Sequence, residues 1–431
     1  MRLLPLARPH AISQREPVKW PGVLPHPSPL PLGEGEGTRL LAVGRVPAVQ
    51  TRADWLPAGE GWGEGENVSQ RHRSDSTETL SDLVSHLRAS PFAPGSFSLA
   101  PVQIEWPRVT IIIPTKPGQA EIPSVEAARK LDYPRERMDI IVARGKQPAI
   151  QRNRALQAAT GEIIYFLDDD ARPAPSALRR AVEHFQKNPQ VQMVGGPNLC
   201  PPDAPFLEQV FAVVLASWIA FGPSRARYDR VGQTRPSGEK ELILCNLLAR
   251  RAALLEAGGF DEALYPNEEN ALMDEITKRG GGLIYDPEVV AERRPRGTLR
   301  AFCKMLMNYG RGRAEQFRRH PTPGSAMNFV PPLFVLYLFA LPILFALPAR
   351  LEPSALLLLL VTLPGLIYWP VLLLQTLASI PRFGFARSVA AFPLLFATHF
   401  FYGVGFWRGL FTDVNRARPA IAEVTLDRPA L

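Results

Sequence analysis

The stretch that decides the fold is EIIYFLDDDARPAP, residues 162–175. Its apolar run, 163–167, has the length and composition of a strand that is buried on both faces. The run ends on three consecutive carboxylates, Asp168, Asp169 and Asp170. Neighbouring like charges repel one another, so the end of a buried strand is an unfavourable place for three of them. The triplet therefore indicates a site at which a positive group offsets the charge.

The sequence around this stretch alternates between strand and helix patterns. Short apolar runs predict further strands at 109–115, 138–145 and 191–197, and longer mixed runs predict helices at 121–131, 151–161 and 174–188. Gly161 is the expected C-cap of the second helix. The alternation predicts an α/β fold with a mostly parallel, Rossmann-like sheet and helices on both faces. Ligands of such sheets bind at the carboxyl ends of the strands, where the aspartates lie.

The charge of the chain points to a membrane surface. The 431 residues carry a formal charge of +8, and basic side chains gather at 293–319, directly before a strongly apolar region. This position favours lipid headgroups over nucleic acid, for which no sequence signature is present. Three isolated cysteines, Cys200, Cys245 and Cys303, form no CxxC pair, which is typical of a protein from a reducing compartment.

Three apolar segments follow the basic cluster, at 329–348, 354–378 and 388–411. Each approaches or exceeds the ~20 residues that a membrane-spanning helix needs. An earlier apolar run, 206–222, is short for a span and predicts a core or interfacial helix.

Arginines near these segments give the expected orientation. The cluster Arg311 to Arg319 places the N-terminal side of the first segment in the cytoplasm, and Arg382 and Arg387 agree with that orientation. Arg416 and Arg418 follow the third segment and would then lie outside, which the positive-inside rule does not favour.

Four regions are therefore expected along the chain. Residues 1–100 form a disordered or non-native extension rich in Pro and Gly, because they lack the apolar periodicity of a packed core. Residues 101–325 form a catalytic domain, 326–415 a transmembrane region of about three helices, and 416–431 a tail.

The aspartate triplet has the ligand chemistry of a magnesium or manganese site. Mg²⁺ and Mn²⁺ prefer carboxylate oxygens and commonly bridge a protein carboxylate to substrate phosphates. If the segment stays extended, Asp168 and Asp170 share one side and Asp169 faces the other. The alternative interpretation of the triplet is a solvated acidic turn.

The motifs together resemble the family 2 glycosyltransferases. The resemblance rests on VTIIIPT at 109–115 and on QRNRALQAATGEIIYFLDDDARP at 151–173. It implies a GT-A fold and a nucleotide-sugar donor. By position, it implies that the donor is contacted by Pro114, Thr115, Arg152, Asn153, Asp168 and Asp169, and that Asp170 and Asp168 hold Mg²⁺ or Mn²⁺. For Arg152, a polar first turn of a helix is the competing interpretation.

The second half of the catalytic region resembles the acceptor half of these enzymes. A Gly-Gly-Phe-Asp-Glu turn at 258–262 precedes an acidic pair, Glu268 and Glu269. By position Glu269 is the expected general base, with Glu268 beside it. The competing interpretation is an acidic first turn that the helix dipole favours. The segment at 308–314, NYGRGRA, resembles the membrane-anchored succinoglycan-type subgroup.

The chain departs from the family pattern at three places. The second strand ends on Ala143, Arg144 and Gly145, where many members have an Asp that binds uracil. Ala271 replaces the usual Asp before Leu, and no Gln-x-x-Arg-Trp motif follows. In its place, arginines of the segments 293–302 and 308–321 are expected to face the donor diphosphate or lipid headgroups, and the competing interpretation is a positive-inside flank.

The sequence thus predicts an inverting glycosyltransferase in the cytoplasmic membrane, with its catalytic domain in the cytoplasm. The expected acceptor is a saccharide or a lipid-linked hydroxyl or phosphate, in the biosynthesis of cell-surface polysaccharide or glycolipid. Other polysaccharide-assembly proteins are further candidate partners, and nucleic acid is not. The alternatives are a metal-dependent nucleotidyl- or phosphotransferase and a membrane scaffold that has lost catalysis.

Overall fold

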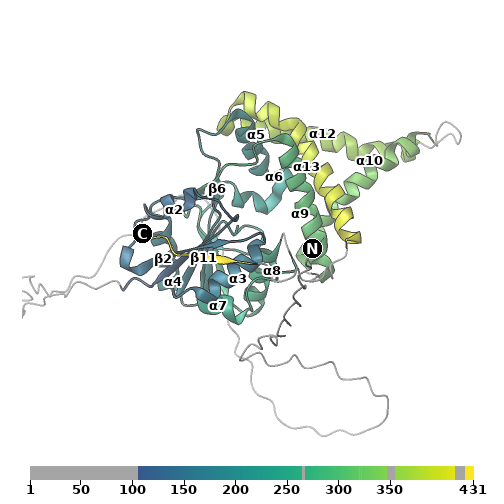
Figure 1. Cartoon of the computed structure of the whole chain (residues 1–431). Coiled ribbons are helices and arrows are strands. Elements are labelled where there is room, and N and C mark those ends of the chain that lie inside the picture. Colours follow the sequence, from purple (N-terminus) through teal and green to yellow (C-terminus); the bar gives the residue numbers. More distant parts are fainter. Residues whose placement is uncertain (1–104, 265–266, 320, 322, 347–354, 413–422) are drawn as a thin grey trace, which may run out of the picture. The chain divides into compact units, whose positions relative to one another are not determined.

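A computed structural model describes residues 105–264, 267–319, 321, 323–346, 355–412 and 423–431. The prediction for residues 1–100 falls outside the described part of the chain. Figure 1 shows an α/β domain followed by long helices. The domain is built on an eight-stranded sheet of order β11-β2-β1-β3-β8-β5-β9-β7.

The large sheet is mixed. Its strands are β1 (Val109–Thr115), β2 (Met138–Arg144), β3 (Ile163–Leu167), β5 (Val191–Gly195), β7 (Arg235–Pro236), β8 (Asn246–Arg250), β9 (Gly282–Tyr285) and β11 (Thr425–Asp427). β1 pairs in parallel with β2 and β3, and β5 pairs in parallel with β9. β8 runs antiparallel between these two parallel groups. Five of the eight strands, β1, β2, β3, β5 and β9, thus run in one direction, which confirms the predicted fold class. The antiparallel direction of β8 was not predicted, because local sequence patterns do not reveal the direction in which a strand enters the sheet.

Helices cover both faces of this sheet. They are α2 (Pro123–Ala128), α3 (Pro148–Ala158), α4 (Ala177–Lys187), α7 (Arg251–Glu256), α8 (Glu268–Lys278) and the short 3₁₀ helix η1 (Arg135–Arg137). Because side chains alternate along a strand, Ile111 and Ile113 of β1 face the core under α2 and α4. Ile112 faces the core under α3, α7 and α8. Both cores are apolar and buried, as the strand patterns predicted.

A small second sheet lies at the carboxyl ends of the central strands. It consists of β4 (Arg172–Pro173), β10 (Ala291–Glu292) and β6 (Asn198–Leu199). β10 pairs with β4, which follows the aspartate triplet, and with β6. The basic segment that starts at Arg293 is therefore held beside the triplet.

The remaining helices are mostly apolar. They are α5 (Phe206–Leu215), α6 (Trp218–Phe221), η2 (Gly222–Arg227), α9 (Leu299–Arg319), η3 (Pro323–Phe329), α10 (Val330–Ala346), α12 (Ala355–Phe383) and α13 (Phe385–Phe411). Three helical segments, 326–343, 361–383 and 385–411, are long and apolar enough to cross a membrane. These match the three predicted apolar segments. The predicted short helix at 206–222 is broken into α5 and α6, and the two parts are bent by 62°.

Two features were not anticipated. Residues 425–427, expected in a tail, form strand β11, which pairs antiparallel with β2 and is drawn in yellow in Figure 1. Gly161 is not a C-cap, since α3 ends at Ala158 and is capped by Ala159 in an extended conformation. Instead, Gly161 packs directly on β1, where its backbone N–H donates to Thr110 Oγ1 at 2.9 Å.

The contact at Gly161 predicts a stability effect. A Cβ at this position would overlap the backbone of Thr110, so Gly161→Ala should destabilise the domain by about 1–3 kcal/mol through overpacking. Gly238→Ala is the matched control, because a Cβ there meets nothing within 4 Å. Thermal unfolding of the detergent-solubilised chain measures both variants. Equal melting temperatures for the two variants would contradict this account of Gly161.

Candidate active site

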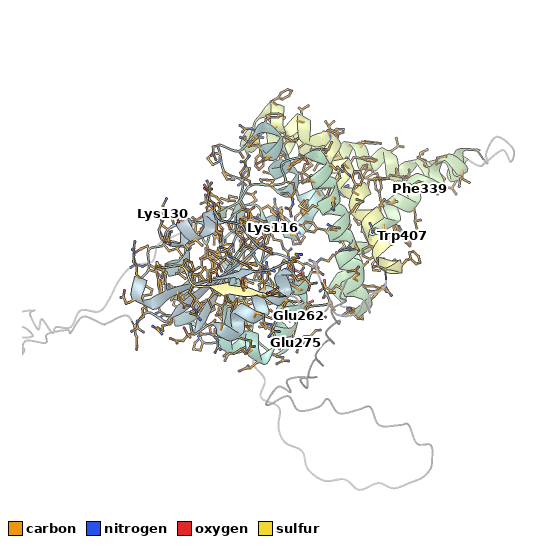
Figure 2. The ribbon with its side chains drawn as sticks, in the orientation of Figure 1. Lys116, Lys130, Glu262, Glu275, Phe339 and Trp407 are labelled. Carbon is orange, nitrogen blue, oxygen red and sulfur yellow. The ribbon has the colours of Figure 1, made fainter. Side chains whose placement is uncertain are left out.

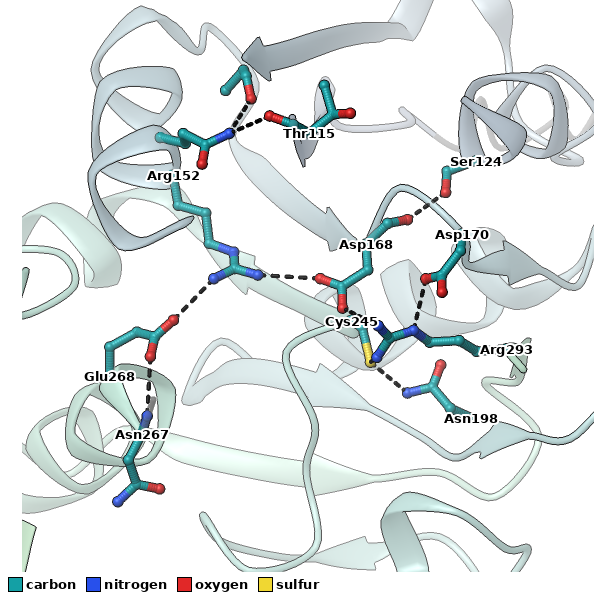
Figure 3. A network of polar contacts seen from close by, with 12 residues as sticks. Thr115, Ser124, Arg152, Asp168, Asp170, Asn198, Cys245, Asn267, Glu268 and Arg293 are labelled. Carbon is teal, nitrogen blue, oxygen red and sulfur yellow. Dashed lines mark hydrogen bonds and ion pairs between the residues drawn. The ribbon is translucent and has the colours of Figure 1, made fainter. Parts of the chain in front are cut away.

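The aspartate triplet follows β3 in a turn. The backbone N–H of Ala171 donates to the carbonyl of Asp168 at 3.1 Å, so the segment does not stay extended as the sequence interpretation assumed. Asp168 and Asp170 nevertheless converge on one cation. Arg293 reaches Asp168 Oδ2 at 3.0 Å and Asp170 Oδ1 at 2.7 Å (Figure 3). A guanidinium therefore offsets the repulsion between these carboxylates.

Arg293 owes its position to the small sheet. It directly follows β10, and its backbone N–H donates to the carbonyl of Leu199 at 2.9 Å. Its Nη1 also lies 3.6 Å from the sulfur of Cys245. The sequence placed Arg293 only within a basic segment that faces either a diphosphate or lipid. The structure directs this side chain to the aspartates.

Arg152 connects the two acidic motifs. Its Nη2 lies 3.1 Å from Asp168 Oδ1, and its Nη1 lies 3.0 Å from Glu268 Oε1. Figure 3 shows the guanidinium between the end of β3 and the start of α8. The side chain is only 7% exposed and lies over the ring of Phe260. Within the described residues its Nε is buried without a hydrogen-bond partner, which leaves a donor at the site.

The two carboxyl groups that share Arg152 have opposite pKa shifts. Burial of Asp168 would raise its pKa, but the charges of Arg293 and Arg152 outweigh burial and hold the pKa below its usual value. Burial and the neighbouring charge of Glu269 raise the pKa of Glu268 to about 7, against the opposing effect of Arg152. Burial also raises the pKa of Asp169. The site thus combines a firmly ionised carboxylate with one that titrates near neutral pH.

The first turn of α8 is held in a fixed position by Asn267. This buried residue has φ 124°, the only positive φ among the described residues other than glycine. Such a conformation is strained and is commonly found at functional sites. Its N–H donates to Glu268 Oε2 at 3.0 Å, and its side chain binds Gln316 and Asn270. These contacts fix the direction in which Glu268 and Glu269 leave the helix.

Glu269 lines a cavity of about 490 Å³ beside α8. Its polar lining includes Glu269, Asn267, Asn270, Lys240 and Arg313. Its apolar lining includes Trp218, Ile219 and Phe221 of α6 and Val330 and Pro331 of α10. The cavity therefore offers both polar and apolar surface to a ligand.

The other predicted donor residues have structural contacts. Pro114 and Thr115 end β1, and the carbonyl of Thr115 accepts a hydrogen bond from Gln151 Nε2 at 2.8 Å. The side chain of Asn153 binds the backbone of Phe260 and the carboxylate of Glu262, so it supports the Gly-Gly-Phe-Asp-Glu turn. The assignment of these three residues to the nucleotide stays a prediction.

At the end of β2, Arg144 pairs with the C-terminal strand. Its Nε lies 2.5 Å from Asp427 Oδ2, and its Nη1 donates to the carbonyl of Gln119 at 2.6 Å. The position that the resemblance associates with the nucleobase is thus filled by a cation that a distant carboxylate neutralises.

The donor set fits a divalent cation only together with substrate phosphates. Among the described residues, no group of three or more His, Cys, Asp or Glu side chains is arranged to hold a metal ion. Asp168 and Asp170 supply two convergent carboxylates, which suffices for Mg²⁺ or Mn²⁺ when a diphosphate completes the coordination. The point on which they converge is held by the guanidinium of Arg293.

Comparisons with known proteins agree with this architecture. Residues 123–254 match the family model described as glycosyl transferase family 2. The chain is 25% identical over 187 residues to a pre-mycofactocin glycosyltransferase of Mycobacterium tuberculosis, in two strains. That alignment covers 41% of this chain and 36% of the relative, so it spans about a third of the curated relatives' length.

Two solved structures are similar to this chain at lower sequence identity. A mannosyltransferase from Pyrobaculum calidifontis, solved with GDP-Man and Mn²⁺, is 22% identical with a TM-score of 0.40, covering 72% of this chain and 92% of that one. Staphylococcus aureus TarS is 14% identical with a TM-score of 0.34, covering 53% and 47%. The family match includes the triplet, Arg152 and β8, and it agrees with the mixed α/β sheet expected of a GT-A fold. Residues 123–254 of this chain are therefore similar to glycosyltransferase family 2.

Proposed function

We propose that this protein transfers a sugar from a nucleoside-diphosphate donor to an amphiphilic acceptor at a membrane. The observation that carries the proposal is the Arg152 bridge, which joins the donor-side Asp168 to the acceptor-side Glu268 at the edge of the sheet. The family 2 match supports the nucleotide-sugar donor. The three apolar helices support membrane association.

The donor diphosphate belongs at the aspartate triplet in this proposal. A bound Mg²⁺ or Mn²⁺ would be held by Asp168 and Asp170 and would neutralise charge on the diphosphate leaving group. Arg293 and Arg152 already bring two positive charges to this point. They are positioned to bind phosphate oxygens, because a guanidinium matches the geometry of such oxygens. Asp169 and the end of β1 form the adjoining wall on the side of the nucleoside.

The acceptor belongs in the cavity beside α8. Glu269 lines this cavity, where it can accept the proton of an acceptor hydroxyl as the new glycosidic bond forms. Glu268 is buried against Arg152, so it acts as a positioning residue for that guanidinium. The apolar residues that α6 and α10 contribute to the lining support a lipid-linked acceptor over a free saccharide. Attack from this side displaces the diphosphate with inversion.

The proposal places residues 101–325 as catalytic domain and 326–415 as membrane region, with the catalytic domain in the cytoplasm. The basic cluster at 293–319 supports that orientation through the positive-inside rule. A role in cell-surface polysaccharide or glycolipid synthesis and the succinoglycan-type subgroup stay predictions. A nucleotidyl- or phosphotransferase would cleave a different bond of the donor. Release of intact nucleoside diphosphate from a labelled sugar nucleotide distinguishes glycosyl transfer from these alternatives.

Removal of the base should suppress the chemical step. Glu269→Gln should lower kcat by about 100- to 10,000-fold and leave donor affinity nearly unchanged, because a general base contributes that much to the rate. Glu275→Gln is the control on the same helix, since it loses only an exposed ion pair with Arg279. Initial rates of nucleoside diphosphate release and calorimetric donor binding are the measurements. A Glu269→Gln enzyme with the kcat of the control would remove Glu269 from this role.

The raised pKa of Glu268 predicts a pH-dependent stability. Between pH 4.5 and 7 the folded chain keeps a proton on Glu268 that the unfolded chain has lost, so folding stability falls as pH rises through this window. Glu268→Gln removes this dependence. The stability of the wild type relative to the variant should therefore fall by on the order of 2 to 3 kcal/mol between pH 4.5 and pH 8. Chemical unfolding of the two chains across this range measures the difference, and parallel pH profiles would contradict the assignment.

The position of Arg293 predicts a change in metal binding. Arg293→Gln removes a positive charge from between Asp168 and Asp170, so Mn²⁺ should bind at least about tenfold more tightly without nucleotide, a difference of about 1.4 kcal/mol. Arg294→Gln is the matched control, because Arg294 pairs with Glu208 instead. Electron paramagnetic resonance of free Mn²⁺ gives both affinities. Unchanged binding in Arg293→Gln would argue against a cation site at these two carboxylates.

A further inference from the structure

Strand β11 fixes the side of the membrane on which the C-terminal segment lies. All three residues of β11 pair with β2, at the register Thr425–Arg144, Leu426–Ala143 and Asp427–Val142. Two ion pairs reinforce the strand, Arg144 with Asp427 at 2.5 Å and Arg428 with Asp139 at 3.1 Å. A hydrogen-bonded sheet cannot be divided by a bilayer. Residues 423–431 therefore lie on the same side of the membrane as the catalytic domain.

This pairing limits how often the chain crosses the membrane. The catalytic domain ends with α9 at Arg319, and the chain is back in the same sheet at Thr425. The number of crossings between these points must be even. Among the described residues of this interval, three helices are apolar and long enough to cross, so at least one of them does not. The same reasoning excludes one crossing by α5 and α6, because β6 and β8 on either side of them both belong to the catalytic domain.

Helix α13 has the contacts of the helix that stays on the domain side. It packs most extensively against α9 and also contacts α5, α10 and α12, with buried residues from Ser388 to Gly409. Its backbone is in close contact with α9, because a Cβ at Gly405 or Gly409 would overlap the backbone of Met307 or Arg311. At its C-terminal end, Arg318 of α9 donates to the carbonyl of Gly409.

The charged side chains of α9 prevent α9 and α13 from lying in the hydrocarbon core of a bilayer. α9 carries six basic residues, Arg300, Lys304, Arg311, Arg313, Arg318 and Arg319. Arg313 pairs with Glu239 of the catalytic domain at 2.9 Å, and Arg319 pairs with Asp261 at 3.3 Å. If α13 crossed the membrane, it would draw these charges into the bilayer at a cost of several kcal/mol each. α9 and α13 together therefore belong at the membrane surface.

Helices α10 and α12 have the surfaces that lipid would cover. Exposed large apolar side chains are frequent on both, and include Leu336, Phe339 and Ile343 of α10 and Leu366, Leu373 and Leu374 of α12. Figure 2 labels Phe339 on α10 and Trp407 on α13. Phe339 is 64% exposed, whereas the indole N–H of Trp407 donates to the carbonyl of Pro332 at 2.9 Å. The apolar segment of α13 is 33% buried, against 11% and 17% for those of α10 and α12.

We propose that α10 and α12 form a hairpin that crosses the bilayer twice, while α13 lies along α9 on the side of the catalytic domain. The occupant of the exposed apolar surface is thus the hydrocarbon of a lipid bilayer. This topology also places most of the flanking arginines of the sequence on one side, 311–319, Arg382, Arg387, Arg416 and Arg418, and leaves Arg350 on the other. Three crossings would have put Arg416 and Arg418 on the other side, against the positive-inside rule. Arg382 is additionally tied to the domain by its ion pair with Asp229.

Cysteine labelling of the full-length chain in sealed membrane vesicles tests this topology. Single substitutions Glu136→Cys, Arg350→Cys and Glu423→Cys report on the domain, on the connection between α10 and α12, and on the segment before β11. Glu136 and Glu423 are exposed. A membrane-impermeant maleimide is added outside, before and after the vesicles are opened with detergent. The parent chain measures background from Cys200, Cys245 and Cys303, whose pKa values are all raised by burial, which slows their reaction.

The proposal expects the Glu136→Cys and Glu423→Cys chains to be labelled from the same side and the Arg350→Cys chain to be labelled from the opposite side. Labelling of Glu423→Cys from the side opposite to Glu136→Cys would overturn it, because α13 would then cross. Labelling of all three variants from one side would also overturn it, because the hairpin would then not span the bilayer. Protease digestion of a C-terminal epitope tag in the same sealed vesicles checks the position of residue 423 without a cysteine substitution.

Discussion

The bridge that Arg152 makes between Asp168 and Glu268 is the interaction on which the rest of the site depends. Asp168 directly follows β3, and Glu268 starts α8, 116 residues away from Arg152 in sequence. Buried charges are costly unless they are paired, and Arg152 is the cation that pairs with the buried Glu268. Loss of Arg152 would leave Glu268 without this ion pair, whereas Asp168 would keep its ion pair with Arg293. The relative placement of donor and acceptor motifs therefore follows from one shared cation.

A second cation, Arg293, offsets negative charge at the aspartate triplet. It neutralises Asp168 and Asp170 in the structure, in the position where a metal–diphosphate complex would bring positive charge and phosphate oxygens. The carboxylates thus remain paired in the absence of substrate. The strained backbone at Asn267 serves the acceptor side in a similar way, since it fixes the first turn of α8 and directs Glu269 toward the cavity.

The cavity beside Glu269 and the apolar region share the same helices. α13 packs against α9 and also contributes Thr398, His399 and Tyr402 to the lining of this cavity. Strand β11 returns the chain to the sheet beyond α13, where Asp427 pairs with Arg144 at the end of β2. The membrane region is therefore joined to the domain at both of its ends, through α9 and through β11. In the proposed topology, this arrangement would keep the candidate site close to the lipid surface.

The sequence by itself determined the elements that depend on local patterns. The buried strands around 163–167, the helices between them, the acidic motifs and three long apolar helices all follow from hydrophobic period and composition. Only the tertiary structure decided the antiparallel entry of β8, the pairing of β11 and the close packing of Gly161 on Thr110. It also decided the partners of Arg152 and Arg293, which lie 116 and 123 residues away in sequence. The physical reason is that strand direction and ion pairing are set by contacts between distant segments, and no local period of side chains encodes them.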